Sequence, residues 1–262
     1  MERRPFVVAT LIKWFDAQGF DEEEVASCSV PCLFLKLPEY SNEKCVEEAD
    51  MLLATTNFQP PPSFAKFAPV SFSSASAQGL TGLLPSWQIW GYFSLESAVN
   101  YPEMEREEYM KQFEVELSTR MFSDVPMTFA PRDSDVIRRP TAEKKFGFAL
   151  YLQSNCVSWR DDIVRELMEH VPVDSLGRCL NNGDIPERMT TVELISRYKF
   201  FIAFENSIHH DFVTERIFNA WIAGAIPIYK GAPNVDDFAP SPRSFLLLDD
   251  FDSVPALAAY LR

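Results

Sequence analysis

The amino-acid sequence predicts an α/β protein built on parallel sheets. Along residues 145–262, short apolar runs alternate with amphipathic runs of about ten residues, which is the pattern of strands joined by helices. Since a helical crossover between two strands of one sheet is right-handed and returns the chain to the same edge, successive strands are expected to run parallel. The length of 262 residues is sufficient for one large or two smaller domains with hydrophobic cores of their own.

The second half of the chain gives the clearer order of elements. The apolar runs that predict strands cover residues 146–153, 173–176, 199–204, 226–230 and 244–248. Helical spacing predicts helices over residues 160–170, 191–198 and 214–225, and a last helix that begins at Ser253. The helix over 191–198 has a recognisable start, because Thr190 precedes it and Glu193 falls in its first turn.

The first half is less regular. Its apolar runs predict strands over residues 6–13, 32–37, 51–55 and 88–93. A polar helix is predicted over residues 103–112. Residues 59–78 are rich in Pro, Ser and Ala, which is typical of a long surface connection.

A second stretch without periodicity, rich in Pro, Arg and Asp, separates the two halves near residues 130–140. It predicts two α/β domains that face each other across a cleft. The predicted divisions are an N-terminal domain of residues 1–130, a linker of residues 131–144 and a C-terminal domain of residues 145–262.

Charge and composition argue against some classes of protein. The formal net charge is −14, which is unfavourable for a protein whose main task is to bind nucleic acid. No segment approaches the roughly 18 consecutive apolar residues of a transmembrane helix, and the N-terminus carries no signal-peptide pattern. Taken alone, these features predict a soluble protein, in which a few placed cations can still bind a phosphate.

The chain has five cysteines and three histidines. No second pair of ligands follows Cys28 and Cys32, so a zinc site is not predicted. The cysteines are either buried thiols or, in an oxidising compartment, one or two disulfides with an unpaired thiol, and the sequence leaves both alternatives open. The two Asp-x-Asp triplets, residues 133–135 and 250–252, are interpreted as solvated turns rather than metal ligands.

The densest group of polar residues follows the predicted strand 199–204. Its members are Glu205, Asn206, Thr214, Glu215 and Arg216. A polar loop between a buried strand and a helix is where open α/β sheets bind nucleotides, since the helix N-terminus offers N–H donors. Each residue alone is more simply explained as a helix cap or as a favourable charge at the helix end. Together, with Arg216 to neutralise a phosphate, they predict a site for an anionic ligand.

Arg160 and Glu96 are the other two candidate functional residues. Arg160 begins the helix after a neighbouring strand and is therefore expected at the same edge of the sheet as Arg216. Two cations on opposite sides of a diphosphate would stabilise the charge of a departing nucleoside diphosphate. Glu96 ends the apolar run 89–95, where a carboxylate that faces a cleft is suited to act as a general base. For each residue taken alone, a solvated surface position is the commoner explanation.

Several separated segments resemble the α1,3-fucosyltransferases. Residues 204–216, with Phe-Glu-Asn-Ser followed by Asp-Phe-Val-Thr-Glu-Arg, are similar to the donor-binding signature of that family. Phe93 to Ser97 resembles its acceptor-side motif. The sequences Gly-Ala-Pro-Asn at 231–234 and Phe-Ala-Pro-Ser-Pro at 238–242 most resemble the plant-like branch of the family, which modifies the core GlcNAc of N-glycans. Further stretches of resemblance are 154–160, 173–182 and 223–228.

The resemblance implies the GT-B architecture, in which two Rossmann-like domains face a central cleft and the C-terminal one binds GDP-fucose. It implies inverting transfer of L-fucose, in α1,3 linkage, to GlcNAc of a glycan, with the N-glycan core as one candidate acceptor and no obligatory metal or cofactor. Glu96 is then the catalytic base, and Arg160 and Arg216 contact the donor phosphates. The remaining donor-binding residues under this resemblance are Asn206, Phe212, Thr214 and Glu215.

The resemblance also implies a protein of the Golgi lumen. A membrane anchor is then expected in a longer full-length protein, together with a C-terminal domain that continues past Arg262. In that oxidising compartment a disulfide between Cys156 and Cys179 is expected. A second disulfide, of Cys45 with Cys28 or Cys32, is an open alternative.

The chain departs from the usual pattern of the family in several places. Phe212 replaces a tyrosine, Arg216 a lysine and Ala98 a proline, and the family's usual Arg-Asp-Ser-Asp before the linker appears as Met-Phe-Ser-Asp at 121–124. The missing tyrosine hydroxyl removes a hydrogen bond worth roughly 0.5–1.5 kcal/mol, and arginine keeps the charge of lysine but changes its shape. Two other hypotheses therefore stay open. One is a non-catalytic module that binds a sugar nucleotide or glycan, and the other is a GT-B enzyme that uses a different nucleotide sugar.

Overall fold

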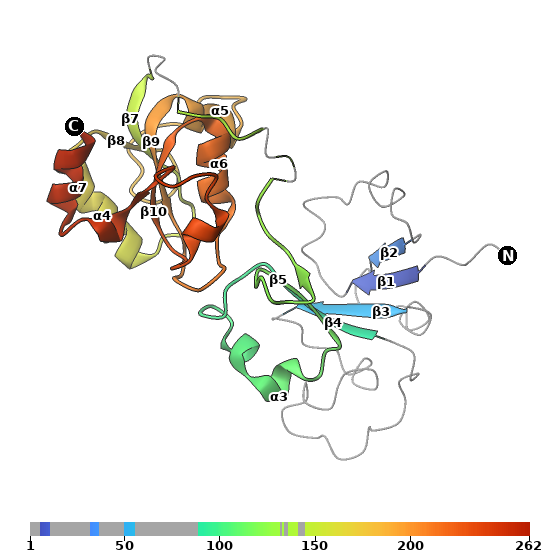
Figure 1. Cartoon of the computed structure of the whole chain (residues 1–262). Helices are drawn as coiled ribbons and strands as arrows, with labels where there is room; N and C mark the ends of the chain where they lie inside the picture. Colours follow the sequence, from blue (N-terminus) through green and yellow to red (C-terminus); the bar gives the residue numbers. More distant parts are fainter. Residues whose placement is uncertain are drawn as a thin grey trace. The chain divides into compact units, whose positions relative to one another are not determined.

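The chain divides into two compact units, Met1–Met127 and Thr128–Arg262. The computed structural model describes residues 6–10, 32–36, 50–55, 89–131, 133, 136–140 and 145–262. Each unit is organised around one sheet (Figure 1). Every described strand pair in both sheets is parallel, so the predicted fold class is confirmed.

The sheet of the first unit has the strand order β2-β1-β3-β4-β5-β6. Its strands are β1 (Phe6–Thr10), β2 (Cys32–Lys36), β3 (Met51–Thr55), β4 (Ile89–Ser94), β5 (Val115–Ser118) and β6 (Val125–Pro126). The first four correspond to the predicted strands. The last two were not predicted, because runs of four and two residues are too short to give a readable apolar alternation.

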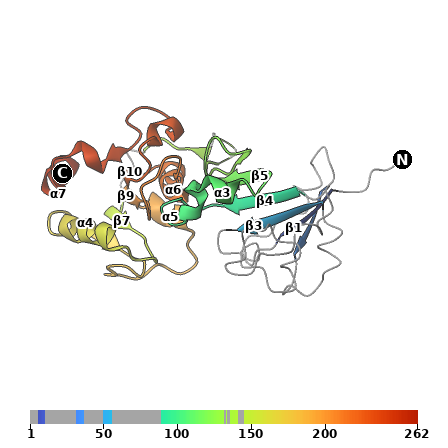
Figure 2. The same cartoon turned by 90° about the horizontal axis from the view of Figure 1, so that it is seen from below.

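The prediction of one polar helix over residues 103–112 is wrong. The structure has a 3₁₀ turn, η5 (Pro102–Glu105), and a single helical turn, α3 (Glu107–Met110), separated by Arg106 in an extended conformation (φ −89°, ψ 109°). Glu103 and Glu107 are like charges at a spacing that destabilises a continuous helix. The break also lets Tyr109 meet Tyr92 of β4 edge to face, at 6.1 Å between ring centroids, so that α3 lies beside β4 (Figure 2).

The sheet of the second unit has the strand order β11-β10-β9-β7-β8. Its strands are β7 (Gly147–Tyr151), β8 (Val173–Ser175), β9 (Tyr198–Phe204), β10 (Ile226–Lys230) and β11 (Leu246–Leu247). Its helices are α4 (Ser158–Met168), α5 (Thr191–Ser196), α6 (Glu215–Ala223) and α7 (Val254–Leu261). Two short 3₁₀ turns, η7 (Val235–Phe238) and η8 (Leu248–Asp250), complete the unit. All the predicted elements of this half are present, with ends that move by a few residues.

The second unit has three layers, with α5 and α6 on one face of the sheet and α4 and α7 on the other (Figures 1 and 2). Side chains of β9 alternate between the two faces, as a strand requires. Phe201 and Ala203 belong to the hydrophobic core under α5 and α6. Ile202 and Phe204 belong to the core under α4 and α7. The central strand is therefore buried on both sides, which explains its almost continuous apolar sequence.

The described part of the segment between the halves packs against the second unit. The backbone N–H of Arg138 donates to the carbonyl oxygen of Trp221 at 3.0 Å. Phe129 and Ile137 pack against the core under α5 and α6. The boundary between the units lies at Met127 and Thr128, three residues before the predicted end of the first domain.

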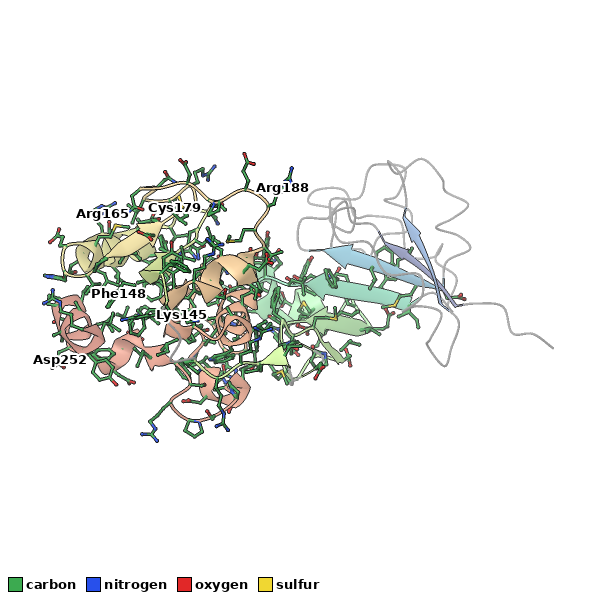
Figure 3. All side chains as sticks on the ribbon, turned by 90° about the horizontal axis from the view of Figure 1, so that it is seen from above. Lys145, Phe148, Arg165, Cys179, Arg188 and Asp252 are labelled. Atoms are coloured by element: carbon green, nitrogen blue, oxygen red, sulfur yellow. A yellow bond between two sulfur atoms is a disulfide. The ribbon has the colours of Figure 1, made fainter. Side chains whose placement is uncertain are left out.

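Two further features concern the setting of the protein. Among the described residues, no helix has the length and apolar character that crossing a bilayer requires. Cys156 and Cys179 form a disulfide with a Cα–Cα distance of 5.4 Å, as predicted, and Cys179 lies in the segment that follows β8 (Figure 3). The alternative pairing of Cys45 with Cys28 or Cys32 lies outside the described side chains.

Candidate functional site

The candidate site is built at the carboxyl edge of the second sheet. The strands β7, β9 and β10 run parallel, so the segments that follow them meet at this edge. Glu205 extends the pairing by one residue past β9, since its N–H donates to the carbonyl oxygen of Lys230 at 2.9 Å. The edge is therefore a rigid platform from which the side chains after each strand project.

Glu205 is the centre of this cluster. The sequence placed it in the polar group after β9, but the resemblance assigned it no role. Its side chain is 0% exposed. It accepts hydrogen bonds from the N–H of Thr214 at 2.8 Å and from Thr214 Oγ1 at 2.7 Å. Arg216 Nη1 lies 3.2 Å from Glu205 Oε2. Burial raises the pKa of Glu205 to about 7, against the opposing effects of Arg216 and Thr214.

Arg216 joins the loop after β9 to the loop after β7. Its Nη1 donates to Thr214 Oγ1 at 2.8 Å, and its Nη2 donates to Gln153 Oε1 at 3.4 Å. The side chain is 20% exposed, so part of it is accessible to solvent. It stands in the first turn of α6, whose backbone N–H groups also favour anions.

Arg160 is enclosed, although it was predicted to contact a ligand. It lies in the first turn of α4 with an exposed fraction of 0%. Its guanidinium donates to the carbonyl oxygens of Asn155 at 2.6 Å and Phe204 at 3.1 Å. Burial lowers its pKa, and the positive charge of Arg216 lowers it further. The structure thus brings the two predicted arginines close together, and contact of Arg160 with a ligand stays a prediction.

Two buried N–H donors of the cluster lack an acceptor among the described residues. They are Arg160 Nε and Gln153 Nε2. The Gln153 carbonyl oxygen accepts the N–H of Cys179 at 3.0 Å. The backbone of Gly177 lies so close that a Cβ there would be 2.3 Å from the same oxygen. Buried donors without partners are costly. Together with the guanidinium groups of Arg160 and Arg216, they make the cluster rich in N–H donors, which suits an anion.

A pair of hydrogen bonds between Asp211 and Asn234 fixes the loop between β9 and α6. Asp211 has a left-handed backbone (φ 64°) and is 5% exposed. Its N–H donates to Asn234 Oδ1 at 2.9 Å, and its carboxylate accepts from Asn234 Nδ2 at 2.9 Å. Asn234 comes from the Gly-Ala-Pro-Asn stretch after β10. In the sequence this stretch shows only the family resemblance. Asn234 is 23 residues from Asp211, so no local pattern predicts their contact.

The other predicted donor-binding residues lie on the same loop. Asn206 is half-buried, and its Oδ1 accepts from Ser207 Oγ at 3.0 Å. Phe212 is buried at 1% exposure. The Thr214 hydroxyl donates to the Glu205 carboxylate and makes no capping hydrogen bond to α6. Glu215 is exposed, with Oε1 3.8 Å from Arg216 Nη1. The roles of these residues stay predictions.

Glu96, the predicted catalytic base, belongs to the first unit. It lies two residues after β4 and is half-buried. Its Oε2 accepts from Asn100 Nδ2 at 3.0 Å, and its N–H donates to Ser94 Oγ at 3.1 Å. The local hydrogen bonds orient the carboxylate at the end of a buried strand, the position that the sequence predicted. Its catalytic role stays a prediction.

Two other places in the described part of the second unit have ligand-like features. Cys156, Cys179 and Asp161 lie close enough to share a metal ion, but the two sulfurs are bonded to each other in the disulfide. A cavity of about 360 Å³ lies among residues of β8, α5 and the start of β9, including Asp174, Leu194 and Tyr198. No predicted donor-binding residue lines this cavity, so it is separate from the candidate site.

Two α/β units, each built on a parallel sheet, match the architecture of the GT-B fold. Solved structures support the fold. The chain superposes on a crystal structure of α1,3-fucosyltransferase with a TM-score of 0.63 and 17% identity, over 98% of this chain and 76% of that one. The structure of α1,3-fucosyltransferase with GDP gives a TM-score of 0.60 and 17% identity, over 98% and 77%.

Residues 142–262 match the C-terminal model of glycosyltransferase family 10 (fucosyltransferase). The chain is 33% identical over 199 residues to alpha-(1,3)-fucosyltransferase B of Drosophila melanogaster, which covers 66% of this chain and 45% of the relative. It is 31% identical over 195 residues to GDP-fucose protein O-fucosyltransferase 3 of Xenopus laevis, covering 66% and 42%. The human protein of the same name is 30% identical over 195 residues, covering 66% and 41%. The match thus spans less than half the length of these relatives.

Proposed function

We propose that the protein transfers L-fucose from GDP-fucose to an acceptor hydroxyl, with inversion at the sugar carbon. The single observation that carries the proposal is the cluster of Arg216, Arg160 and Gln153 around Glu205, in a domain of the fucosyltransferase family. Its two guanidinium groups and its N–H donors fit the diphosphate of a nucleotide sugar.

In this proposal the second unit binds the donor and stabilises the leaving group. Negative charge grows on the diphosphate as the bond to fucose breaks, and Arg216 lies at the surface where it meets that charge. Arg160 stabilises the diphosphate without direct contact, because its buried charge contributes positive potential at the edge of the sheet. Asn206, Phe212, Thr214 and Glu215 line the nucleotide and sugar, as the resemblance implies.

Glu96 is the proposed catalytic base, which takes the proton from the attacking acceptor hydroxyl. Replacement by Gln keeps the shape and the hydrogen bond from Asn100 but removes the basicity. We expect Glu96→Gln to reduce turnover by on the order of 10²–10⁴-fold while GDP affinity stays unchanged. An unchanged turnover would show that the base is another residue.

The proposed acceptor is GlcNAc of a glycan, in α1,3 linkage, with the N-glycan core as the first substrate to test. A protein hydroxyl is the second candidate, because relatives with 30–31% identity are named GDP-fucose protein O-fucosyltransferase 3. The two acceptors are separated by an assay with GDP-fucose and either GlcNAc-terminated N-glycans or folded and unfolded acceptor proteins without glycans. Mass spectrometry of the product then shows whether fucose is on sugar or on Ser and Thr.

Donor binding is tested by calorimetry with GDP on the wild type and on Arg216→Ala. We expect the variant to lose affinity for GDP and GDP-fucose together, because the lost contact is to the diphosphate that both share. Binding of GDP without any transfer to any acceptor would favour a non-catalytic sugar-nucleotide module. Tighter binding of UDP or CMP sugars would favour a different donor.

The setting of the reaction is also a proposal. The disulfide between Cys156 and Cys179 suits the oxidising lumen of the Golgi, where a full-length protein with a membrane anchor would act. We propose that no divalent metal is required. Transfer that persists after treatment with a chelator would support this, and transfer that is lost and then restored by Mn²⁺ or Mg²⁺ would contradict it.

A further inference from the structure

Glu205 is in an unusual position for a carboxylate. Its negative charge is buried, but the residue that balances this charge, Arg216, is partly exposed to solvent. The Glu205 side chain is 0% exposed, whereas Arg216 is 20% exposed. Among the described residues, Glu205 forms a salt bridge with Arg216 alone. The two Thr214 hydrogen bonds, at 2.8 and 2.7 Å, stabilise the charged carboxylate but do not neutralise it.

The remaining charged and titratable groups around Glu205 cannot replace Arg216. From α4, Arg160 contributes a favourable charge, but its guanidinium is committed to the carbonyl oxygens of Asn155 and Phe204. From α6, the carboxylate of Glu215 disfavours a second negative charge. From β10, the Tyr229 hydroxyl accepts the N–H of Ala232, and burial, together with the negative charge of Glu205, raises the pKa of Tyr229.

A diphosphate would approach the same guanidinium from the solvent side. Arg216 stands in the first turn of α6, where helix N–H groups favour an anion. An arginine can bind a phosphate through two N–H groups at once. Here Nη1 already serves Glu205 and Thr214, and Nη2 lies at a long 3.4 Å from Gln153. Both hydrogens of Nη1 are therefore in use, and a diphosphate that binds through Nη1 displaces Glu205 from this nitrogen.

We propose that Glu205 and the diphosphate of the donor compete for Arg216, so that Glu205 takes up a proton from the solvent when the nucleotide binds. The inference rests on the proposed function, since it requires a diphosphate at Arg216. The charges balance, because the diphosphate replaces the carboxylate as counter-ion of Arg216 and Glu205 becomes a neutral acid. Glu205 is a positioning residue in this scheme and does not touch the reacting atoms.

The proton comes from the buffer, which makes the step measurable. Burial holds the pKa of Glu205 at about 7, and a neighbouring anion raises the pKa of a carboxyl further. At about pH 8, Glu205 is then mostly ionised before binding and mostly protonated after it. We expect uptake of on the order of half a proton or more for each GDP bound, and a GDP affinity that falls by up to tenfold for each pH unit above about 7.5.

The experiment is calorimetry of GDP binding at about pH 8 in two buffers with different ionisation enthalpies. The difference between the two apparent enthalpies gives the number of protons taken up. The wild type alone is informative, so the test does not depend on the folding of a variant. Glu205→Gln, which cannot ionise, is expected to bind GDP with no more than a small fraction of that uptake. Glu166→Gln, which removes an exposed carboxylate of α4 outside the candidate site, is the control and is expected to keep the uptake.

The possible outcomes separate this inference from the function on which it rests. Absence of GDP binding under all conditions would overturn the proposed function. GDP binding with equal enthalpies in both buffers would overturn only the competition for Arg216. Equal uptake in the wild type and in Glu205→Gln would assign the proton to another group and would also overturn it.

Discussion

The pH dependence of stability is a direct test of the buried carboxyl group of Glu205. In the folded chain burial raises its pKa from 4.5 to about 7. The side chain is 0% exposed, so no reduction for solvent screening applies. At 1.36 kcal/mol for each pKa unit, this difference corresponds to about 3 kcal/mol.

The sign of the effect follows from proton binding in the two states. At about pH 4 Glu205 is protonated both in the folded and in the unfolded chain, so it makes no difference to stability there. As the pH rises toward about 7, the unfolded chain loses its proton first, and the free energy of unfolding falls. Above about pH 7.5 both states are ionised, and the contribution is constant at about 3 kcal/mol of destabilisation.

The perturbation is Glu205→Gln, which has nearly the same shape and cannot ionise. We expect the stability of the variant relative to the wild type to rise by about 3 kcal/mol between about pH 4 and about pH 8. Urea unfolding followed by tryptophan fluorescence at several pH values measures this difference, and the contributions of other carboxyl groups cancel. Glu215→Gln is the control and is expected to follow the wild type, because its exposed side chain is solvated. Parallel curves for the wild type and Glu205→Gln would refute the reasoning.

Three further predictions concern the stability of the second unit. Gly231→Ala is expected to cost about 1–3 kcal/mol, because its Cβ would lie 2.4 Å both from Glu205 Cγ and from the Tyr229 hydroxyl; unchanged thermal unfolding would contradict that packing. Replacing Cys156 and Cys179 together by Ala is expected to cost about 3 kcal/mol, since the disulfide closes a sequence separation of 23 residues, and five free thiols in the denatured wild type would exclude it. Thr190→Ala is expected to cost about 1 kcal/mol by removing the capping box at the start of α5, whereas Thr190→Ser should keep most of the stability in denaturant unfolding.

The second sheet could be predicted because its elements carry strong local patterns. The strand β9 has apolar residues on both faces, and α6 follows it with a helical spacing of apolar residues. In the first unit, residues 103–112 have a composition compatible with helix, and the like charges of Glu103 and Glu107 are too weak a signal to predict an extended Arg106. Packing of Tyr109 on Tyr92 decides that break, and it depends on residues that are distant in the sequence.

The candidate site was predicted in its location but not in its internal order. The sequence placed Arg160 and Arg216 at one edge of the sheet, and the structure brings them together. It did not show that Glu205 would be fully buried, because its partner Thr214 is nine residues away along the chain. The contact of Asp211 with Asn234 spans 23 residues. Such contacts leave no periodic pattern, so they become visible only in the folded chain. The plant-like branch stays a prediction, as do the separate roles of the site residues.

The disulfide has a consequence for where the protein can mature. Cys156 directly follows Asn155, whose carbonyl oxygen holds the guanidinium of Arg160. The N–H of Cys179 donates to the backbone carbonyl oxygen of Gln153. The side-chain amide of Gln153 in turn contacts Arg216. A covalent bond that forms only under oxidising conditions thus anchors the backbone beneath both arginines. A chain produced in a reducing cytoplasm would lack this anchor, so heterologous expression should use a secretory route.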